Sequence, residues 1–174
     1  MAKLYFSREE MERLNIEKLA ERGVTVEDIA EVAYNQQLKY NPNVSMDEVI
    51  ISVKKILSLR DVFHLLQLGA EIDILAEKGL LSQPIQDIIN YDLGVFGIDE
   101  IFGLDIARLY GSIGQTNFGD IDVNKPGIVH KLNEEGKKEG HCHTFLDDIV
   151  GAIAAAATIR ISQIVSEDNA AKLK

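Results

Sequence analysis

The sequence contains few of the residues that mark loop-rich or cross-linked proteins. Three prolines occur in 174 residues, which argues against an all-β fold with many connecting loops. The single cysteine, Cys142, excludes an internal disulfide framework and fits a reducing cytoplasm. The first 15 residues contain no apolar signal core, so the sequence predicts a cytoplasmic protein.

Positive charge is also scarce. The chain has 18 Lys and Arg against 28 Asp and Glu, which gives a formal net charge of -10 at pH 7 and an isoelectric point near 4.8. A protein of this charge repels the phosphate backbones of nucleic acids. We therefore expect no nucleic-acid partner.

Long hydrophobic runs are missing as well. The most apolar run, Ile149 to Ile159, is bounded by Asp148 and Arg160 and is well short of the ~20 residues that a spanning helix needs. Because alanine dominates this run, it predicts a buried helix packed closely against its neighbours. The sequence therefore predicts no membrane span, although peripheral docking on a membrane surface stays open.

The residues that are present favour helices. Hydrophobic residues make up 46% of the chain, enough to bury a core. Three capping-box patterns begin helical segments, at Ser7 with Glu10, Thr25 with Asp28, and Ser45 with Glu48. We predict an all-α protein, a single domain of about six to eight helices over residues 1–174, with the small-residue-rich C-terminal helix at its centre.

Apolar spacing places the longer elements within this domain. In the N-terminal helical part, residues 1–90, an amphipathic helix runs from Arg60 to Lys78, and its predicted inward residues are Val62, Leu65, Leu66, Gly69, Ile72 and Leu75. Residues 91–165 carry the acidic motifs. There we predict a helix over 98–109, a loop over 111–124, a helix over 126–135 with Pro126 at its first position, and a last long helix over 146–165.

Two adjacent acids, Asp99 and Glu100, lie in an apolar segment. Ionised carboxylates in apolar surroundings cost several kcal/mol unless a cation or hydrogen-bond donors satisfy them. A hard divalent cation such as Mg²⁺ takes oxygen ligands, so this pair is a candidate metal site. The alternative is a helix start, where acidic side chains interact favourably with the helix dipole.

A second acid pair, Asp147 and Asp148, meets the alanine-rich run. Thr144 and Asp147 fit a capping box, so Asp147 has a structural alternative that Asp148 lacks. Small residues after the pair would let another helix approach closely. Two acid pairs on helices that pack together would make a four-carboxylate metal cage.

Between the acid pairs lies a segment with Asp120, Asp122 and Lys125. Its Asp-x-Asp spacing is similar to the nucleophile motif of aspartyl-phosphate phosphatases, but that motif ends a buried strand, and we predict no strand here. Lys125 lies beside the free backbone N–H groups of the Pro126 helix and is a candidate phosphate contact. The alternative is a solvated loop lysine.

The run His141-Cys142-His143 combines soft metal ligands at adjacent positions, which is a poor spacing for zinc. We predict that this run forms a loop at the rim of the site. His64 and His130 are predicted to be structural or at the surface. The pair Lys137-Lys138 is solvated, or forms a local basic face toward anionic lipid.

Four motifs follow one another between Asp92 and Ile159. They are Asp92, Ile98-Asp99-Glu100-x-x-Gly103, Phe118-x-x-x-Asp122-x-x-Lys125-Pro126 and Leu146-Asp147-Asp148-Ile149. Together they resemble the phosphatidylglycerophosphatase A family. Membrane-embedded members of that family carry a Gly/Pro-rich N-terminal motif and spanning helices. Residues 1–90 contain neither, so the chain resembles a soluble branch that lacks transmembrane helices.

The resemblance implies Mg²⁺-dependent hydrolysis of phosphatidylglycerophosphate to phosphatidylglycerol and phosphate. The metal ligands that it implies are Asp99, Glu100, Asp147 and Asp148. Lys125 would contact the phosphate, Asp122 would be a general base or a nucleophile, and Asp92 would support the metal ligands. The partner is then a phosphorylated lipid or a phosphorylated small molecule.

Two other functions stay open at the level of sequence. One is a soluble phosphatase or a nucleotide pyrophosphohydrolase that uses an acidic Mg²⁺ site. The other is a non-enzymatic helical module for oligomerisation or partner docking, in which the acid pairs only cap helices. We expect a homo-oligomer in either case, because the amphipathic helices of a small chain need to bury apolar surface.

Overall fold

The structure is a computed structural model that describes residues 5–94 and 96–172. Within these residues the chain forms nine α-helices and one short 3-10 helix, η1. In chain order they are α1 (Arg8–Glu21), α2 (Val26–Gln37), α3 (Met46–Leu57), α4 (Arg60–Glu77), α5 (Ile85–Asn90), α6 (Ile98–Ala107), η1 (Arg108–Tyr110), α7 (Ser112–Asn124), α8 (Ile128–Gly136) and α9 (Leu146–Ala171).

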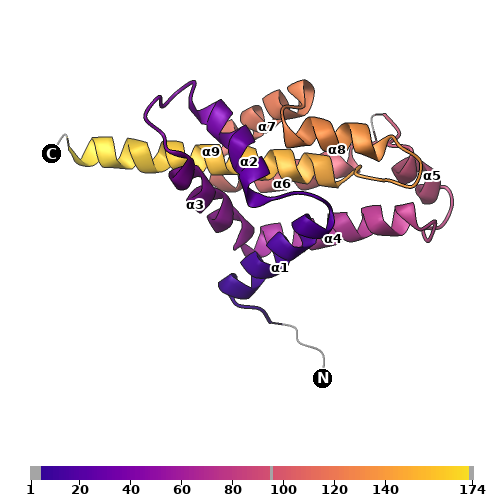
Figure 1. Ribbon diagram of the computed structural model, residues 1–174. Helices are drawn as coiled ribbons and strands as arrows, with labels where there is room; N and C mark the ends of the chain where they lie inside the picture. Colours follow the sequence, from indigo (N-terminus) through magenta and orange to yellow (C-terminus); the bar gives the residue numbers. More distant parts are fainter. Residues whose placement is uncertain (1–4, 95, 173–174) are drawn as a thin grey trace.

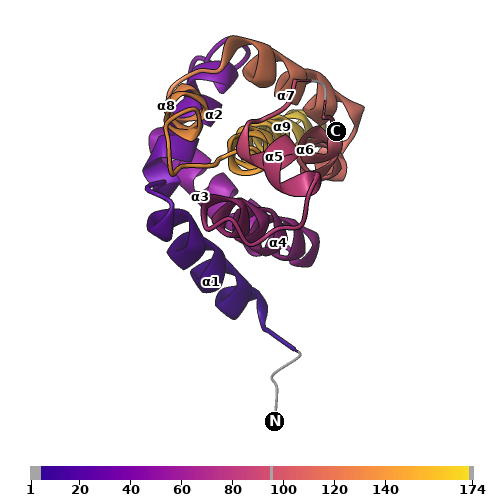
Figure 2. The same cartoon turned by 90° about the vertical axis from the view of Figure 1, so that its right-hand side faces the viewer.

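Helix α9 is the axis around which the other helices pack (Figure 1). Figure 2 looks along this axis and shows α2, α3, α4, α6, α7 and α8 around α9 and in contact with it, whereas α1 packs outside α3 and α4. Every residue of α9 from Leu146 to Ile159 is buried. The predicted all-α class and the central position of the C-terminal helix are confirmed.

By length and composition, α9 is sufficient to cross a membrane. Its most apolar window has a mean hydropathy of 1.6. The prediction that no segment is long enough was therefore wrong, because Asp148 and Arg160 lie inside the helix and do not end it. Inside the protein, 67% of that window is buried. The apolar composition of α9 thus serves the packing of the core, since a helix that is apolar on all sides must be covered on all sides.

The three capping boxes predicted at Ser7, Thr25 and Ser45 are all formed. In the first, Ser7 Oγ accepts a hydrogen bond from the Glu10 N–H at 3.2 Å, and the Glu10 carboxylate accepts one from the Ser7 N–H at 2.9 Å. The other two boxes, at the starts of α2 and α3, make the same reciprocal hydrogen bonds. These contacts join residues three apart in the chain, which is why the sequence alone predicts them.

The buried face of α4 is rotated from its predicted position. The face passes through Val62, Phe63, Leu66, Gly69, Ala70, Asp73 and Ala76. Three residues predicted to point inward, Leu65, Ile72 and Leu75, are half-buried. The rotation places a carboxylate, that of Asp73, in the core of the protein.

The segment predicted as a loop over 111–124 is helix α7, which raises the number of helices above the predicted range. Gly114 and Gly119 lower its intrinsic helix propensity, but Gly114 also lets the backbone of α7 approach that of its neighbour. A Cβ at Gly114 would collide with the carbonyl oxygen of Ala107, and Phe118 packs against Gly103 of α6. Tertiary packing therefore stabilises a helix that local propensity disfavours.

Helix boundaries in the second half also differ from the prediction. Helix α8 begins at Ile128 and not at Pro126, because Lys125 (φ 43) and Gly127 (φ 55) take a left-handed backbone before it. Helix α6 ends at Ala107 and continues as η1, and α9 extends to Ala171. The turn between α7 and α8 matters most for the site, since it directs the side chain of Lys125.

Candidate functional site

A cavity of about 170 Å³ lies between the loop that precedes α6, the end of α7 and the start of α9. Its lining residues are Asp92, Leu93, Phe96, Gly97, Asp99, Glu100, Asp122, Lys125, Asn133, Asp147 and Asp148. All seven residues that the sequence analysis selected for the site are among them. Their roles as metal ligands and catalytic groups stay predictions.

The start of α9 is held by a carboxylate that lies far away in the sequence. Asp73 of α4 accepts hydrogen bonds from the backbone N–H of Phe145 at 3.1 and 3.2 Å and from that of Leu146 at 3.0 Å. The capping box of Thr144 with Asp147, which the sequence offered as the structural alternative for Asp147, is not formed, and Thr144 Oγ1 donates instead to the carbonyl oxygen of Ile89 at 2.7 Å. Because Asp73 caps the helix, the side chain of Asp147 faces the cavity.

An ion pair anchors the loop that leads into α9. Arg22 binds the Glu77 carboxylate through contacts of 2.9 and 2.6 Å and donates to the carbonyl oxygen of Cys142 at 2.7 Å. Glu77 also accepts the N–H of Cys142 at 2.9 Å. Burial, followed by the charge of Arg22, lowers the pKa of His143 to about 4, so the neutral ring can accept an Arg22 N–H at 3.2 Å.

Lys125 points into the group of carboxylates from the end of α7. Its Nζ lies 2.7 Å from Asp122 Oδ1, 3.0 Å from Asp147 Oδ2 and 3.6 Å from Asp148 Oδ1. Burial alone would lower the pKa of Lys125, but these carboxylates outweigh it and raise the pKa above its ordinary value. The ammonium therefore stays charged and holds together side chains from two helices.

Burial raises the pKa of both Asp147 and Asp148. The charge of Asp147 raises the pKa of Asp148 further, whereas the Lys125 ammonium partly opposes the rise at each residue. The two residues are only 6% and 4% exposed. Both carboxylates can ionise at low free-energy cost only if more positive charge enters the cavity.

Asp99 carries an unsatisfied oxygen. Among the described residues, its buried Oδ1 has no hydrogen-bond partner. Burial raises the pKa of Asp99, and the charge of Asp92 adds to the rise. Asp99 and Glu100 lie in the first turn of α6, which begins after Gly97 (φ 76). A buried carboxylate oxygen without a partner destabilises the fold unless a cation or a donor contacts it.

The carboxylate oxygens at the cavity are of the type that a hard divalent cation takes as ligands. Over residues 5–94 and 96–172, no three His, Cys, Asp or Glu side chains already surround a common point as metal ligands, and the Lys125 ammonium lies among three of the carboxylates. The acidic side chains at the cavity nevertheless offer only carboxylate oxygens, and Asp99 Oδ1 is unsatisfied. The residues that could hold Mg²⁺ are Asp99, Glu100, Asp147 and Asp148.

The run His141-Cys142-His143 does not converge on one point. His141 is exposed, Cys142 Sγ lies 3.6 Å from Asp73 Oδ1, and His143 faces Arg22. Burial, followed by the charge of Asp73, raises the pKa of Cys142 to about 12, so the thiol stays protonated. This run was predicted to form a loop at the rim of the site. His143 lines a small adjoining cavity together with Thr144, Asp92 and Asp147, which agrees with that prediction.

Asp73, which supports the site by capping α9, was not predicted as a functional residue. A signal for it was present, because Leu66, Gly69, Asp73 and Ala76 share one face of a helix. An acid on an apolar helical face is as informative as the acid pairs that the analysis selected. Arg22 was also missed, and it has no comparable local signal.

Comparison with known proteins identifies the family of the chain. The family model described as Phosphatidylglycerophosphatase A matches residues 23–163. This match begins well before Asp92, where the motif resemblance begins. A protein of Bacillus subtilis (strain 168), described as uncharacterized protein YutG, is 47% identical over 145 residues, which cover 83% of this chain and 86% of that protein.

Solved structures show the same fold. The low temperature requirement C protein from Listeria monocytogenes is 47% identical with a TM-score of 0.86, covering 90% of this chain and 97% of that one. The protein YpjQ from Bacillus subtilis is 42% identical with a TM-score of 0.87, covering 93% of this chain and 99% of that one. The family match spans most of the chain and includes every carboxylate at the cavity. The chain therefore belongs to the phosphatidylglycerophosphatase A family.

Proposed function

We propose that the protein is a Mg²⁺-dependent phosphomonoesterase that hydrolyses phosphatidylglycerophosphate to phosphatidylglycerol and phosphate. Membership of the family suggests a phosphatase. The observation that carries the proposal is the meeting of six carboxylates and one lysine at a single cavity, contributed by segments far apart in the sequence. A non-enzymatic module in which the acids only cap helices gives no reason for this convergence.

The charge of the cavity supports the requirement for a metal. A phosphate monoester is itself an anion, and the lining offers one ammonium against six carboxylates. Without added positive charge, electrostatic repulsion would exclude the substrate. We propose that Asp99, Glu100, Asp147 and Asp148 hold Mg²⁺. When bound, Mg²⁺ would neutralise charge on the phosphoryl oxygens and make a bound water more acidic.

Lys125 and Asp122 act as a pair in this proposal. The Lys125 ammonium donates hydrogen bonds to a phosphoryl oxygen and so orients the phosphate. Because Lys125 Nζ lies 2.7 Å from Asp122 Oδ1, a phosphate held by Lys125 lies beside the Asp122 carboxylate. Asp122 then removes a proton from a water that attacks the phosphorus while the bond from phosphorus to the glycerol oxygen breaks and that oxygen takes up a proton. Alternatively, the Asp122 carboxylate attacks the phosphorus and displaces the same oxygen, and water then hydrolyses the aspartyl phosphate to release phosphate. Asp92 supports the ligand carboxylates from the loop before α6.

Apolar side chains beside the cavity support a lipid substrate. Leu93 lines the cavity and is 56% exposed, and Ile98 and Ile101 at the start of α6 are 46% and 55% exposed. An acyl or glyceryl group that covered them would remove apolar surface from water. We propose that this edge of the protein makes peripheral contact with the membrane that holds the lipid.

Release of phosphate by the purified protein tests the proposal. The substrates to compare are phosphatidylglycerophosphate in mixed micelles and glycerol 3-phosphate in solution, each with Mg²⁺ and with EDTA. We expect release from the lipid that depends on Mg²⁺ and falls about 100-fold or more in Asp99→Asn and in Asp148→Asn. Asp120→Asn is the matched control, because Asp120 is exposed on α7 and lies outside the cavity.

Three results would contradict the proposal in different ways. Full activity in both cavity variants would remove the proposed ligands. Equal release from glycerol 3-phosphate and from the lipid would indicate a soluble phosphatase. Release of pyrophosphate from a nucleoside triphosphate, without release from the lipid, would indicate a nucleotide pyrophosphohydrolase.

A further inference from the structure

A second cavity, of about 440 Å³, lies between α1, α3 and α9. Its lining residues are Arg8, Glu9, Glu12, Ile51, Lys54, Lys55, Ser58 and Arg160. It shares no lining residue with the carboxylate cavity. Along α9, Arg160 lies twelve residues beyond Asp148, which corresponds to about 18 Å of helix. This cavity is therefore separate from the site described above.

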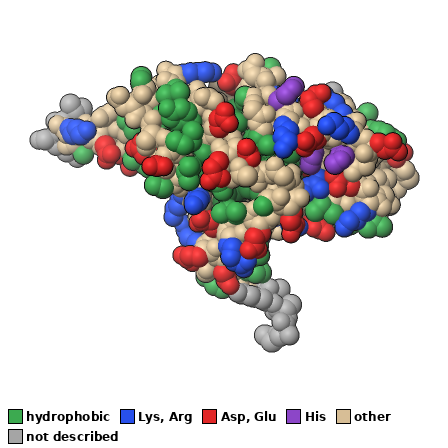
Figure 3. Space-filling view, viewed as in Figure 1, with side chains coloured by type: hydrophobic (Ala, Val, Ile, Leu, Met, Phe, Trp, Pro, Cys, Tyr) green, Lys and Arg blue, Asp and Glu red, His purple; other side chains and the backbone are tan. Residues whose placement is uncertain are grey.

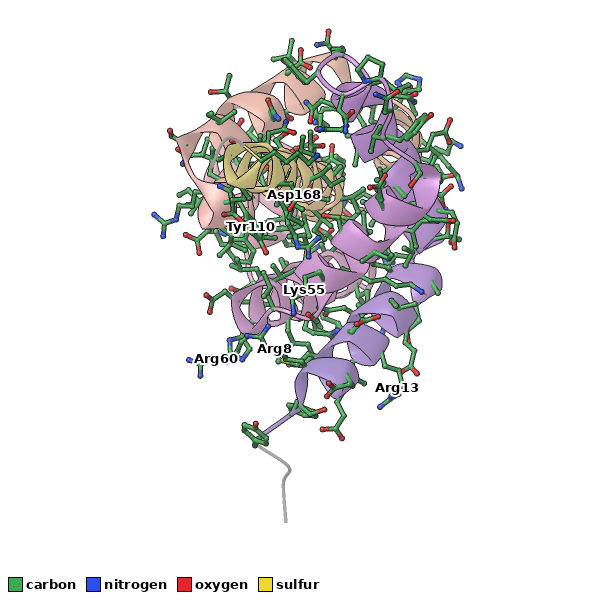
Figure 4. All side chains as sticks on the ribbon, turned by 90° about the vertical axis from the view of Figure 1, so that its left-hand side faces the viewer. Arg8, Arg13, Lys55, Arg60, Tyr110 and Asp168 are labelled. Carbon is green, nitrogen blue, oxygen red and sulfur yellow. The ribbon has the colours of Figure 1, made fainter. Side chains whose placement is uncertain are left out.

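Four cationic side chains from three helices meet at this cavity, although the chain carries a net charge of -10. Figure 3 shows Lys and Arg side chains gathered beside α3, and in Figure 4 Arg8 and Lys55 lie on the same side of the molecule as Arg60. Among the described residues, Arg8, Lys54, Lys55 and Arg160 form no ion pair. Glu9 and Glu12 also line the cavity, so the cations outnumber the carboxylates two to one.

Helix dipoles account for only part of this arrangement. Lys54 and Lys55 lie in the last turn of α3, where the helix dipole favours cations. Arg8 is the first residue of α1, where the dipole disfavours a cation. Arg160 lies in the middle of α9, where the dipole has little effect, and the four positive charges repel one another. A bound anion would relieve both the repulsion and the unfavourable position of Arg8.

We propose that this cavity binds a phosphate-bearing anion. Guanidinium groups such as those of Arg8 and Arg160 bind phosphate through paired N–H donors, and the lysines add positive charge. Ligand sites in proteins have volumes of roughly 300–1,000 Å³. A cavity of about 440 Å³ therefore has room for a ligand with more than one phosphate group. The proposal does not rest on the proposed enzymatic function, because none of these residues lies at the carboxylate cavity.

Calorimetric titration with pyrophosphate in EDTA tests this site, since EDTA removes any divalent cation that would draw phosphate to the carboxylates. We expect saturable binding by the wild type and a Kd raised about tenfold or more in the double variant Lys55→Gln/Arg160→Gln. The double variant Lys78→Gln/Lys131→Gln removes the same charge from exposed positions outside both cavities and should bind like the wild type. Unfolding temperatures check that all three proteins are folded.

Two outcomes of the titration would overturn the proposal. One is an absence of saturable binding by the folded wild type. The other is equal weakening in the cavity variant and in the control variant, which would mean that only net charge matters. If Lys55→Gln/Arg160→Gln does not fold, Lys54→Gln and Arg8→Gln, each measured alone, take its place.

The source of the phosphate group is decided by vesicle sedimentation. Vesicles of phosphatidylcholine with and without phosphatidic acid are mixed with the wild type and with both double variants. Binding that requires phosphatidic acid, is lost in Lys55→Gln/Arg160→Gln and is displaced by pyrophosphate would identify a lipid headgroup as the ligand. Pyrophosphate binding without sedimentation would identify a soluble phosphate compound. Each result supports the site and separates the two sources.

Discussion

Asp148 is a buried acid whose ionisation is costly in the metal-free fold. It is buried beside Asp147, and both carboxyl groups lie close to the ammonium group of Lys125. Because burial raises the folded-state pKa of both acids, the folded protein holds protons that the unfolded chain releases. The stability contributed by these groups is therefore fully present below their unfolded pKa of about 4, and it is lost as the pH rises through the raised folded pKa values.

This loss of stability with rising pH leads to a prediction for the variant Asp148→Asn. In EDTA at neutral pH, we expect the variant to raise the free energy of unfolding by about 1 to 4 kcal/mol, because Lys125 keeps Asp122 and Asp147 as partners. The gain should shrink toward pH 4. Urea unfolding at several pH values measures it, with Asp120→Asn as the control. A loss of stability in Asp148→Asn at neutral pH would contradict this account of the pair.

Burial also raises the pKa of Asp73, but its carboxyl group stabilises the fold because it accepts hydrogen bonds from backbone N–H groups at the start of α9. We expect Asp73→Ala to lower the free energy of unfolding by about 2 kcal/mol or more. Thr144 and Asp147 would then be able to form the capping box that the sequence suggests, which would turn Asp147 away from the cavity. Urea unfolding and Mg²⁺ titration measure the two effects. Lower stability with unchanged Mg²⁺ affinity would show that the cap does not position Asp147.

At the scale of helices, the sequence predicts what is local. The boxes at Ser7, Thr25 and Ser45 depend on residues three apart, so each helix start was predicted correctly. The start of α9 depends on Asp73, which lies more than seventy residues earlier, and the local capping box that the sequence offered there as an alternative is not formed. Helix α7 is stabilised by its contacts with α6 and α9. Because these contacts are not visible in its own sequence, the segment was predicted to be a loop.

The difference between local and long-range contacts also decides how much of the candidate site could be predicted from the sequence. The acid pairs Asp99-Glu100 and Asp147-Asp148 could be selected from sequence because carboxylates are unusual in apolar segments. The ion pairs of Lys125 could not be predicted from the sequence, because they depend on the left-handed turn between α7 and α8. Arg22 holds the loop before α9 through its ion pair with Glu77 and its hydrogen bond to Cys142. These three residues lie in separate segments, and no single segment predicts the contacts.

The glycines of α7 give a test of the packing that holds this helix. Gly114→Ala should lower the free energy of unfolding by about 1 to 3 kcal/mol, because the added Cβ would meet the backbone of Ala107. Gly119→Ala lies in the same helix with open space around its Cβ and should raise stability by up to about 1 kcal/mol. Thermal unfolding of both variants measures the difference. Equal effects would mean that α7 is not packed closely on α6.

At the scale of the whole molecule, α9 combines two tasks. Its first half forms the core and carries the acid pair into the cavity, and its last turns project beyond the other helices (Figure 1). The homo-oligomer expected from the sequence stays a prediction. Sedimentation equilibrium should give a mass that is a multiple of 19.3 kDa, because exposed apolar side chains such as Tyr40 and Ile113 favour association. A single species of 19.3 kDa would contradict it.

Calorimetric titration of the metal-free protein with Mg²⁺ tests the central claim most directly, namely that distant carboxylates form one cation-binding cavity. The account predicts saturable binding by the wild type that is lost in Asp99→Asn and in Asp148→Asn, which lie on different helices, and that persists in Asp120→Asn. Binding of equal affinity in all four proteins, or no binding by the wild type at millimolar Mg²⁺, would contradict it.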